Sequence, residues 1–117
     1  MLNQVVLVGR LTDDVEVVKT ENGKSYSTIT LAVQRSFKNS EGVYETDFIR
    51  CKLWNGIAEN SSQYCHKGDI VGIKGRIQVD KFEDKENNED KFMTEIIAEK
   101  VTFLSSKKIN KEDQERE

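Results

Sequence analysis

The alternation of apolar and polar residues along the chain predicts β-strands interrupted by one short helix. Period-two patterns or short apolar runs typical of strands occur at residues 3–11, 15–19, 25–36, 43–54, 69–80 and 92–104. Between two of these strands, Asn22-Gly23 predicts a hairpin with a type I′ turn, which needs positive φ angles. Residues 39–42 are a polar loop and residues 83–91 a charged loop.

The period changes after Gly56, where apolar residues fit one side of a short helix rather than a strand. The residues on that side are Ile57, Ala58, Tyr64 and Cys65. Gly68 is the expected glycine just beyond the end of the helix.

The order of these elements predicts an all-β protein with the OB-fold. If residues 3–11 and 15–19 form one long, broken strand, the chain makes three strands, a helix and two strands. That is the order of a five-stranded Greek-key barrel with one short helix between strands 3 and 4. Gly75 is in phase with its strand's apolar face (Val71, Ile73, Ile77 and Val79), as a bulge or bend requires. We therefore expect one domain over residues 1–104, followed by a disordered charged tail over residues 105–117.

Residues 48–54 carry the main functional signal. On a strand, Ile49, Cys51 and Leu53 form a core face, and the opposite face carries Phe48, Arg50, Lys52 and Trp54. Aromatic rings stack on unpaired bases and cations attract phosphates, and single-stranded nucleic acid offers both. Six residues at about 3.3 Å each place the two rings about 20 Å apart, far enough to stack on different bases of one strand.

The net charge of −3 argues against a simple nucleic-acid binder, but its distribution softens this objection. Residues 1–79 are nearly balanced, whereas residues 80–91 hold six acidic and three basic residues. Binding depends on a local basic stripe rather than on the total charge.

The sequence excludes several other classes of protein. It contains no Ser-His-Asp arrangement, no phosphate-binding Gly-Lys-Ser/Thr loop and no zinc motif, so we expect neither an enzyme nor a cofactor. Cys51 and Cys65 with the single His66 do not make a metal site, and we expect both to be buried, reduced thiols. With no signal peptide and no apolar run long enough to span a bilayer, we expect a cytoplasmic protein without membrane contacts.

Several motifs resemble the bacterial single-stranded DNA-binding protein (SSB) family. They are Asn3–Thr12 (NQVVLVGRLT), Thr30–Phe37 (TLAVQRSF), Asp47–Trp54 (DFIRCKLW), Ala58–Asn60, Lys67-Gly68 and Gly75–Gln78. The likeness covers residues 1–104 in order. It implies an OB-fold that assembles as a homotetramer, wraps single-stranded DNA during replication, recombination, repair or DNA uptake, and associates with the nucleoid.

The resemblance also implies particular contact residues. The family's stacking aromatics fall on Phe37, Phe48, Trp54 and Phe82, and its basic contacts on Arg10, Arg35, Arg50, Lys52, Lys67 and Arg76. From the residues themselves we add Lys74, which shares a strand face with Arg76, and Lys81, which adjoins Phe82. Phe37 could instead cap the barrel end. We expect Phe92 and Phe103 in the core and Tyr64 in helix packing.

The chain departs from the family pattern in three places. Family members usually continue into a Gly/Pro/Gln-rich linker and an acidic terminal peptide that recruits partner enzymes, so we do not expect such recruitment here. Short, tailless paralogues, including some used in DNA uptake by Gram-positive bacteria, have similar Arg35–Phe37 and Tyr64–Gly68 stretches. Asn55-Gly56 replaces a site that is often basic, and the loop 83–91 is unusually acidic.

Two other functions remain open at this point. The negative charge is also compatible with an OB-fold module that binds a protein partner in a primosome or recombination complex. RNA binding would use the same groove, and competition between matched RNA and DNA oligomers decides between them, since the 2′-hydroxyl is the distinguishing group.

Overall fold

The computed structural model describes residues 1–106, which form six strands and one helix. They are β1 (Val5–Leu11), β2 (Val18–Lys19), β3 (Ser25–Lys38), β4 (Tyr44–Trp54), α1 (Asn55–Tyr64), β5 (Ile70–Asp84) and β6 (Glu89–Ser105). Most of the predicted charged tail therefore lies outside the described residues.

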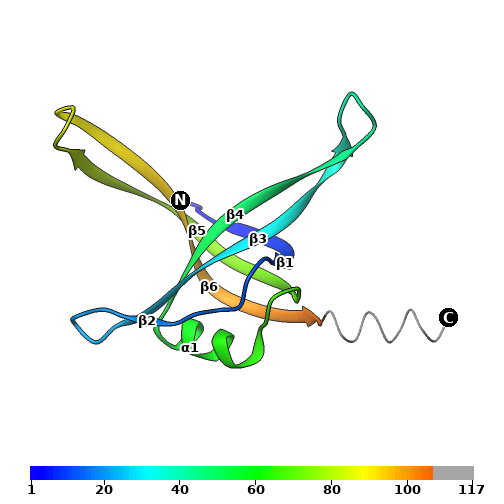
Figure 1. Ribbon diagram of the computed structural model, residues 1–117, viewed down its shortest axis with the longest axis horizontal. Coiled ribbons are helices and arrows are strands. Elements are labelled where there is room, and N and C mark those ends of the chain that lie inside the picture. The colour runs from blue at the N-terminus through cyan, green and yellow to red at the C-terminus, as the bar shows by residue number, and fades with distance from the viewer. Residues whose placement is uncertain (107–117) are drawn as a thin grey trace.

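Five of these strands close into a barrel. They are bonded in the order β1-β5-β6-β4-β3, and β3 pairs back with β1. The β4–β6 pairing is parallel and the others are antiparallel. The two-residue β2 pairs only with the start of β3, so β1 and β2 together act as the predicted long, broken strand. The OB-fold prediction, with the helix between β4 and β5, is confirmed (Figure 1).

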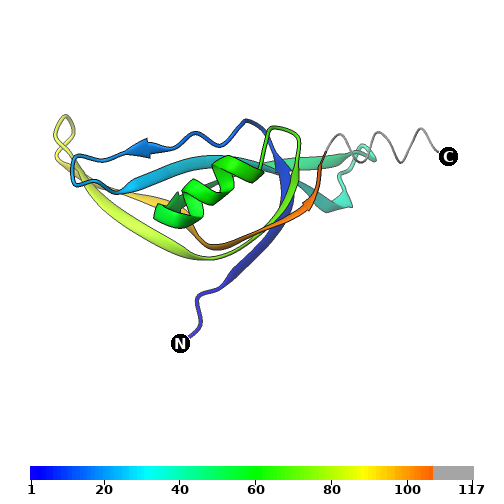
Figure 2. The same cartoon turned by 90° about the horizontal axis from the view of Figure 1, so that it is seen from below.

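The core lies inside the barrel and follows from strand alternation. Leu31 on β3, Leu53 on β4, and Val71 and Ile73 on β5 have almost no exposed surface. Figure 2 shows α1 lying across the barrel, and Ala58 of this helix is completely buried. The predicted core faces of β3 and β4 are therefore correct.

Two long hairpins extend beyond the barrel, one formed by β3 and β4 and the other by β5 and β6 (Figure 1). The second hairpin corrects the expected core face of β5, because Ile77 is 44% and Val79 57% exposed. The side-chain alternation continues past Gly75, but no second layer of the protein covers that part of the strand. We call these hairpins the β3–β4 arm and the β5–β6 arm.

Gly75 marks the place where the β5–β6 arm begins. The pairing register shifts between Lys74 and Gly75, which confirms the predicted irregularity. A Cβ atom on Gly75 would lie 2.2 Å from the carbonyl oxygen of Ile97. Only glycine allows the two backbones to approach this closely.

The charged segment 83–91 is mostly paired strand rather than loop, which corrects the prediction. β5 and β6 pair as far as Asp84 and Glu89, and only residues 85–88 form the tip. Ion pairs join Lys91 to Asp84 at 2.9 Å and Lys81 to Asp90 at 3.2 Å across the two strands. These ion pairs are diagonal, since the directly facing pairs Glu83–Asp90 and Asp84–Glu89 carry like charges. Opposite charges on diagonal positions still reach one another across two strands, so a charged segment need not be a loop.

Two predicted roles of glycine are also corrected. Gly23 has a positive φ but Asn22 does not, so the β2–β3 hairpin lacks a type I′ turn. Instead, the amide of Gly23 donates to the carbonyl of Thr20, and the amide of Thr20 donates to the carbonyl of Lys24. Gly68 does not end the helix, which stops at Tyr64; its φ of 92° serves the turn that leads into β5.

Three aromatic side chains expected inside the protein lie on its surface. The exposed fraction is 67% for Phe92, 44% for Phe103 and 70% for Tyr64. Phe92 belongs to the β5–β6 arm, Phe103 lies near the end of β6, and Tyr64 is the last helical residue. Apolar neighbours in sequence do not provide a covering layer at these places.

Candidate nucleic-acid interface

The outward face of β4 presents the two aromatic and two basic residues predicted from the sequence. Phe48 is 67% exposed, and the side chains of Arg50, Lys52 and Trp54 follow at alternate positions. Cys51 and Leu53, on the other side of the strand, are buried. The predicted orientation of β4 is therefore confirmed.

The pairing of β3 with β4 extends this face by one strand. Directly opposed residues in an antiparallel pair share a face, and the opposed pairs are Tyr26–Trp54, Thr28–Lys52, Thr30–Arg50 and Ala32–Phe48. Arg10 of β1 lies opposite Ala32 and continues the last row. We call this surface the β4 face; it carries rings at both ends with cations and threonine hydroxyls between them.

The sharp turn after Trp54 positions its ring. Asn55 has a φ of 52°, a left-handed conformation that Asn accepts more readily than most residues. Its side-chain Oδ1 accepts a hydrogen bond from the amide of Ser25 at 3.3 Å, which joins the start of α1 to β3. Asn55 therefore serves this turn.

Lys52 lies over two rings at once. Its Nζ is 4.9 Å from the centre of the Tyr26 ring and 4.9 Å from that of Trp54. The two ring centres are 5.5 Å apart, with the planes tilted by 46°. This cluster closes one end of the β4 face.

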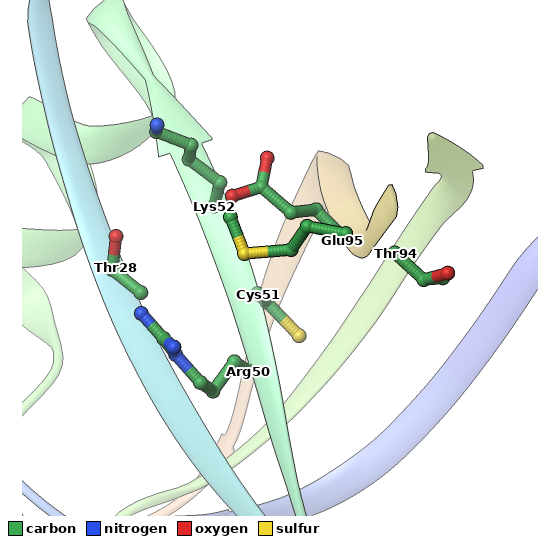
Figure 3. A pocket seen from close by; sticks show the side chains of 7 residues that line it. Thr28, Arg50, Cys51, Lys52, Thr94 and Glu95 are labelled. Atoms are coloured by element: carbon green, nitrogen blue, oxygen red, sulfur yellow. The ribbon is translucent and has the colours of Figure 1, made fainter. Parts of the chain in front are cut away.

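A small pocket opens where β4 separates from β6. It is lined by Thr28, Arg50, Cys51, Lys52, Met93, Thr94 and Glu95. Figure 3 shows Arg50 and Lys52 on β4, with Glu95 coming from the neighbouring strand. The carboxylate of Glu95 places one negative charge beside two positive ones, so the face is mixed rather than uniformly basic.

A second hollow lies at the other end of the β4 face. It is lined by Arg10, Leu11, Thr12, Ala32, Lys67 and Gly68. Arg10 donates from Nη1 to the carbonyl of Gly68 at 2.6 Å, which orients the guanidinium and leaves its other N–H groups available. This hollow brings Arg10 and Lys67 together next to the row that contains Phe48.

Arg35 lies on the opposite side of the β3–β4 arm. Its Nε and Nη2 donate to the carboxylate of Asp47, and its Nη1 donates to Glu45. This ion pairing lowers the pKa of Asp47 and raises that of Arg35, in both cases first through their mutual hydrogen bond. Because Asp47 adjoins Phe48 on β4, the two side chains point to opposite faces, so Arg35 does not join the β4 face.

Residues 2–104 match the Single-strand binding protein family. This chain belongs to that family. It is 46% identical over 107 residues to Single-stranded DNA-binding protein B of Bacillus subtilis, covering 92% of this chain and 94% of that relative. It is 47% identical over 107 residues to Single-stranded DNA-binding protein A of the same organism and 48% identical over 104 residues to the Halalkalibacterium halodurans protein. It spans 62% and 61% of those two relatives, so less than two thirds of their length.

Membership of the single-strand binding protein family does not by itself place every predicted residue on one surface. The structure gathers five of them on the β4 face, namely Arg10, Phe48, Arg50, Lys52 and Trp54, and Lys67 lines the adjoining hollow. Ile97 of β6 lies opposite both Lys52 of β4 and Arg76 of β5. Arg76 therefore lies on the same side of the sheet as the β4 face.

The other predicted residues lie elsewhere. Lys74 faces Val6 and Lys100 on the outer surface of β1, β5 and β6. Phe82 and Lys81 are consecutive on the β5–β6 arm and point to opposite faces of it. Phe37 is 82% exposed and shares a hollow on the β3–β4 arm with Arg35 and Glu45. A ligand that touches all of them has to follow a path around the barrel.

Tyr26 lies on the β4 face, and Met93 and Glu95 line its pocket, but sequence reasoning missed all three. Tyr26 is out of phase with Ile29 and Leu31 of its strand, which signals an outward side chain. Its position beside Trp54 depends on the β3–β4 register, which the sequence pattern alone does not determine. Met93 and Glu95 reach the pocket only through the parallel pairing of β4 with β6.

Two other kinds of feature, a metal site and a membrane-spanning helix, have no candidate in the part of the chain that the structure describes. Within residues 1–106, no group of three or more His, Cys, Asp or Glu side chains is arranged to hold a metal ion. In the same range, no helix has the length and apolar character needed to cross a membrane. Cys51 and Cys65 are free and buried, as predicted.

Proposed function

We propose that this chain binds single-stranded DNA with little sequence preference, by stacking bases on aromatic rings and neutralising phosphates with Arg and Lys. The observation that carries the proposal is the β4 face, where the rings of Phe48 and Trp54 flank the cations of Arg50 and Lys52. Because every base has a π face, stacking favours unpaired strands over duplex without selecting a sequence. The names of the relatives describe the same ligand.

The ligand path has a core and extensions. The core is the β4 face with Arg10 and the nearby Lys67. Phe37 and Phe82, together with Arg35, Lys74, Arg76 and Lys81, extend it if the strand continues around the barrel and over the two arms. The chain acts by binding, in DNA replication, recombination, repair or uptake, and we assign it no reaction and no cofactor. Its place is the cytoplasm, in association with the nucleoid.

The functional unit is a homotetramer. Val6 and Val8 on the outer side of β1 are 69% and 55% exposed, and Leu104 of β6 is 50% exposed. Gly72 pairs opposite Val8, and a Cβ atom added to Gly72 would lie 3.6 Å from Cδ1 of Leu104. The side chains of Val8 and Leu104 are therefore close together on this surface. An apolar patch of this kind marks an interface between proteins.

Two matched variants test the site. Phe48 and Phe92 are both 67% exposed, so replacing either by Ala leaves the core intact. A stacked base contributes about 1–3 kcal/mol, so Phe48→Ala should weaken binding to a labelled dT oligomer about 5- to 150-fold. Phe92→Ala, on the face of the arm opposite Phe82, should change it little.

Trp54 supplies an independent signal because it is the only tryptophan. Stacking should quench its emission strongly during a dT titration, and unchanged emission would contradict the proposal. Equal affinity for matched RNA and DNA oligomers would broaden the ligand class to both nucleic acids. Binding to a protein partner that survives nuclease and high salt, with no oligomer binding, would replace the proposal by a protein-interaction module.

A further inference from the structure

Tyr26 occupies the middle of an outward row at the end of the β4 face. Val18 of β2, Tyr26 of β3 and Trp54 of β4 are directly opposed across three neighbouring strands. Val18 is 47% exposed, so the row continues as an apolar surface beyond the Tyr26 ring. Tyr26 is thus one strand farther along the same surface as Trp54, about 4.8 Å away.

The two rings form one unit rather than two separate contacts. Their centres are 5.5 Å apart and their planes are tilted by 46°, an arrangement common for packed aromatic pairs. An unpaired base that stacks on Trp54 therefore also meets the edge or face of Tyr26. A single exposed ring would offer such a base less contact.

Lys52 already uses the faces of both rings. Its Nζ lies 4.9 Å from each ring centre, within the range of a cation–π contact. A base and an ammonium group cannot occupy the same ring face, and Lys52 lies one row away, next to Thr28. A long, flexible lysine side chain can move from the rings to a nearby phosphate without any change of backbone.

We propose that Tyr26 is a further base-stacking residue of this protein, and that Tyr26 and Trp54 together receive one nucleobase. When the base arrives, Lys52 leaves the two rings and pairs with the phosphate of the bound strand. The inference rests on the proposed function, since it concerns how the same face holds single-stranded DNA. It assigns a direct contact to Tyr26 and a change of partner to Lys52.

Photochemical crosslinking tests the direct contact. Halogenated uracil crosslinks to aromatic side chains on which it stacks, so the probe is a dT oligomer containing 5-iododeoxyuridine. Trypsin separates Tyr26, the only aromatic residue of fragment 25–35, from Trp54 in fragment 53–67. We expect adducts on both fragments. Adducts on 53–67 without any on 25–35 overturn the role of Tyr26 and leave the proposed function standing. Adducts on neither of these fragments, nor on fragment 39–50 that carries Phe48, contradict the β4 face itself.

Affinity variants separate stacking from simple packing. Tyr26→Leu keeps an apolar side chain but removes the π face, and it should weaken dT binding about 5-fold or more. Tyr26→Phe should stay within about 2-fold of the unchanged protein, since it keeps the ring. Tyr64→Leu is the control, because Tyr64 is 70% exposed at the far end of α1. If Tyr26→Leu binds normally while Trp54→Leu does not, Tyr26 takes no part in binding.

The salt dependence tests the movement of Lys52. Each phosphate contact on a single strand adds about 0.7 to the slope of log K against log salt. Lys52→Met should therefore lower that slope by about 0.7. Lys85→Met, at the tip of the β5–β6 arm, is the charge-matched control and should leave it unchanged. An equal slope for Lys52→Met and the unchanged protein would show that Lys52 stays on the rings and would overturn the exchange.

Discussion

Arg35 and Arg50 carry the same charge in the same pair of strands, but the structure predicts different effects on the salt dependence of binding. Among residues 1–106, no carboxylate lies within ion-pair distance of Arg50, whereas Arg35 is held by both Asp47 and Glu45. When Arg50 meets a phosphate, a counterion leaves the DNA. When Arg35 does so, it must give up two protein carboxylates, which then face the DNA unpaired.

The magnitude follows from counterion release. Arg50→Met should reduce the slope of log K against log salt by about 0.7. Between 50 and 200 mM salt, the unchanged protein would then lose about 2.6-fold more affinity than this variant does. Arg35→Met should leave the slope nearly unchanged. Both substitutions make the net charge more negative by one unit, so any general charge effect is the same in the two variants.

The assay is fluorescence anisotropy of a labelled dT oligomer at four or five salt concentrations. Removing the carboxylates with Asp47→Asn and Glu45→Gln provides the reverse test, since it frees Arg35 and should raise affinity at low salt. Arg35 lowers the pKa of Asp47, so the carboxylate is fully ionised above its ordinary pKa. The ion pair is lost only when the pH falls through the lowered pKa. The contrast should therefore be the same at pH 7 and pH 5. Equal slope changes for Arg35→Met and Arg50→Met would refute the reasoning.

Three further predictions concern the barrel and its assembly. Gly75→Ala should lower the melting temperature by about 10 °C or more in a circular dichroism melt, because the new Cβ meets the carbonyl oxygen of Ile97; Gly56→Ala, with nothing within 4 Å of its Cβ, should not. Burial raises the pKa of Cys51 to about 11, so a thiol reagent at pH 8 should label it only after unfolding, and stability should fall between about pH 9 and 11 as the unfolded thiol ionises first. Val6→Asp should leave a folded chain of lower sedimentation mass than the proposed tetramer, and an unchanged mass would place the interface elsewhere.

Residues 48–54 show how much of the candidate site the sequence could predict. A period of two over seven residues assigns each side chain to a face, and the burial of Cys51 and Leu53 then leaves Phe48 and Arg50 outside. The same reasoning located the OB-fold order and the irregularity at Gly75. These features follow from the pattern of residue types along a short stretch of chain.

The features that sequence reasoning missed depend on contacts between distant segments. Alternation assigned Ile77 and Val79 to an apolar face but could not show where the covering layer ends. The placement of Tyr26 beside Trp54 requires the register of β3 against β4. Arg35 looked available because its partner Asp47 is 12 residues away, on the returning strand of the arm. Each error arose because burial or pairing was determined by another strand.

The negative net charge alone does not rule out binding at the β4 face, where Glu95 is the acidic residue lining the pocket beside Arg50 and Lys52. In the acid-rich arm, Asp84 and Asp90 are paired with Lys91 and Lys81, so part of that charge is neutralised locally. Four cations lie on or beside the β4 face, namely Arg10, Arg50, Lys52 and Lys67. Together they would give a salt slope of about 2.8, or about a 50-fold loss of affinity between 50 and 200 mM salt. Stacking does not depend on counterions, so its share of the affinity remains as salt rises. A slightly acidic protein can therefore hold a polyanion through its rings, with cations supplying the approach and the alignment of the strand.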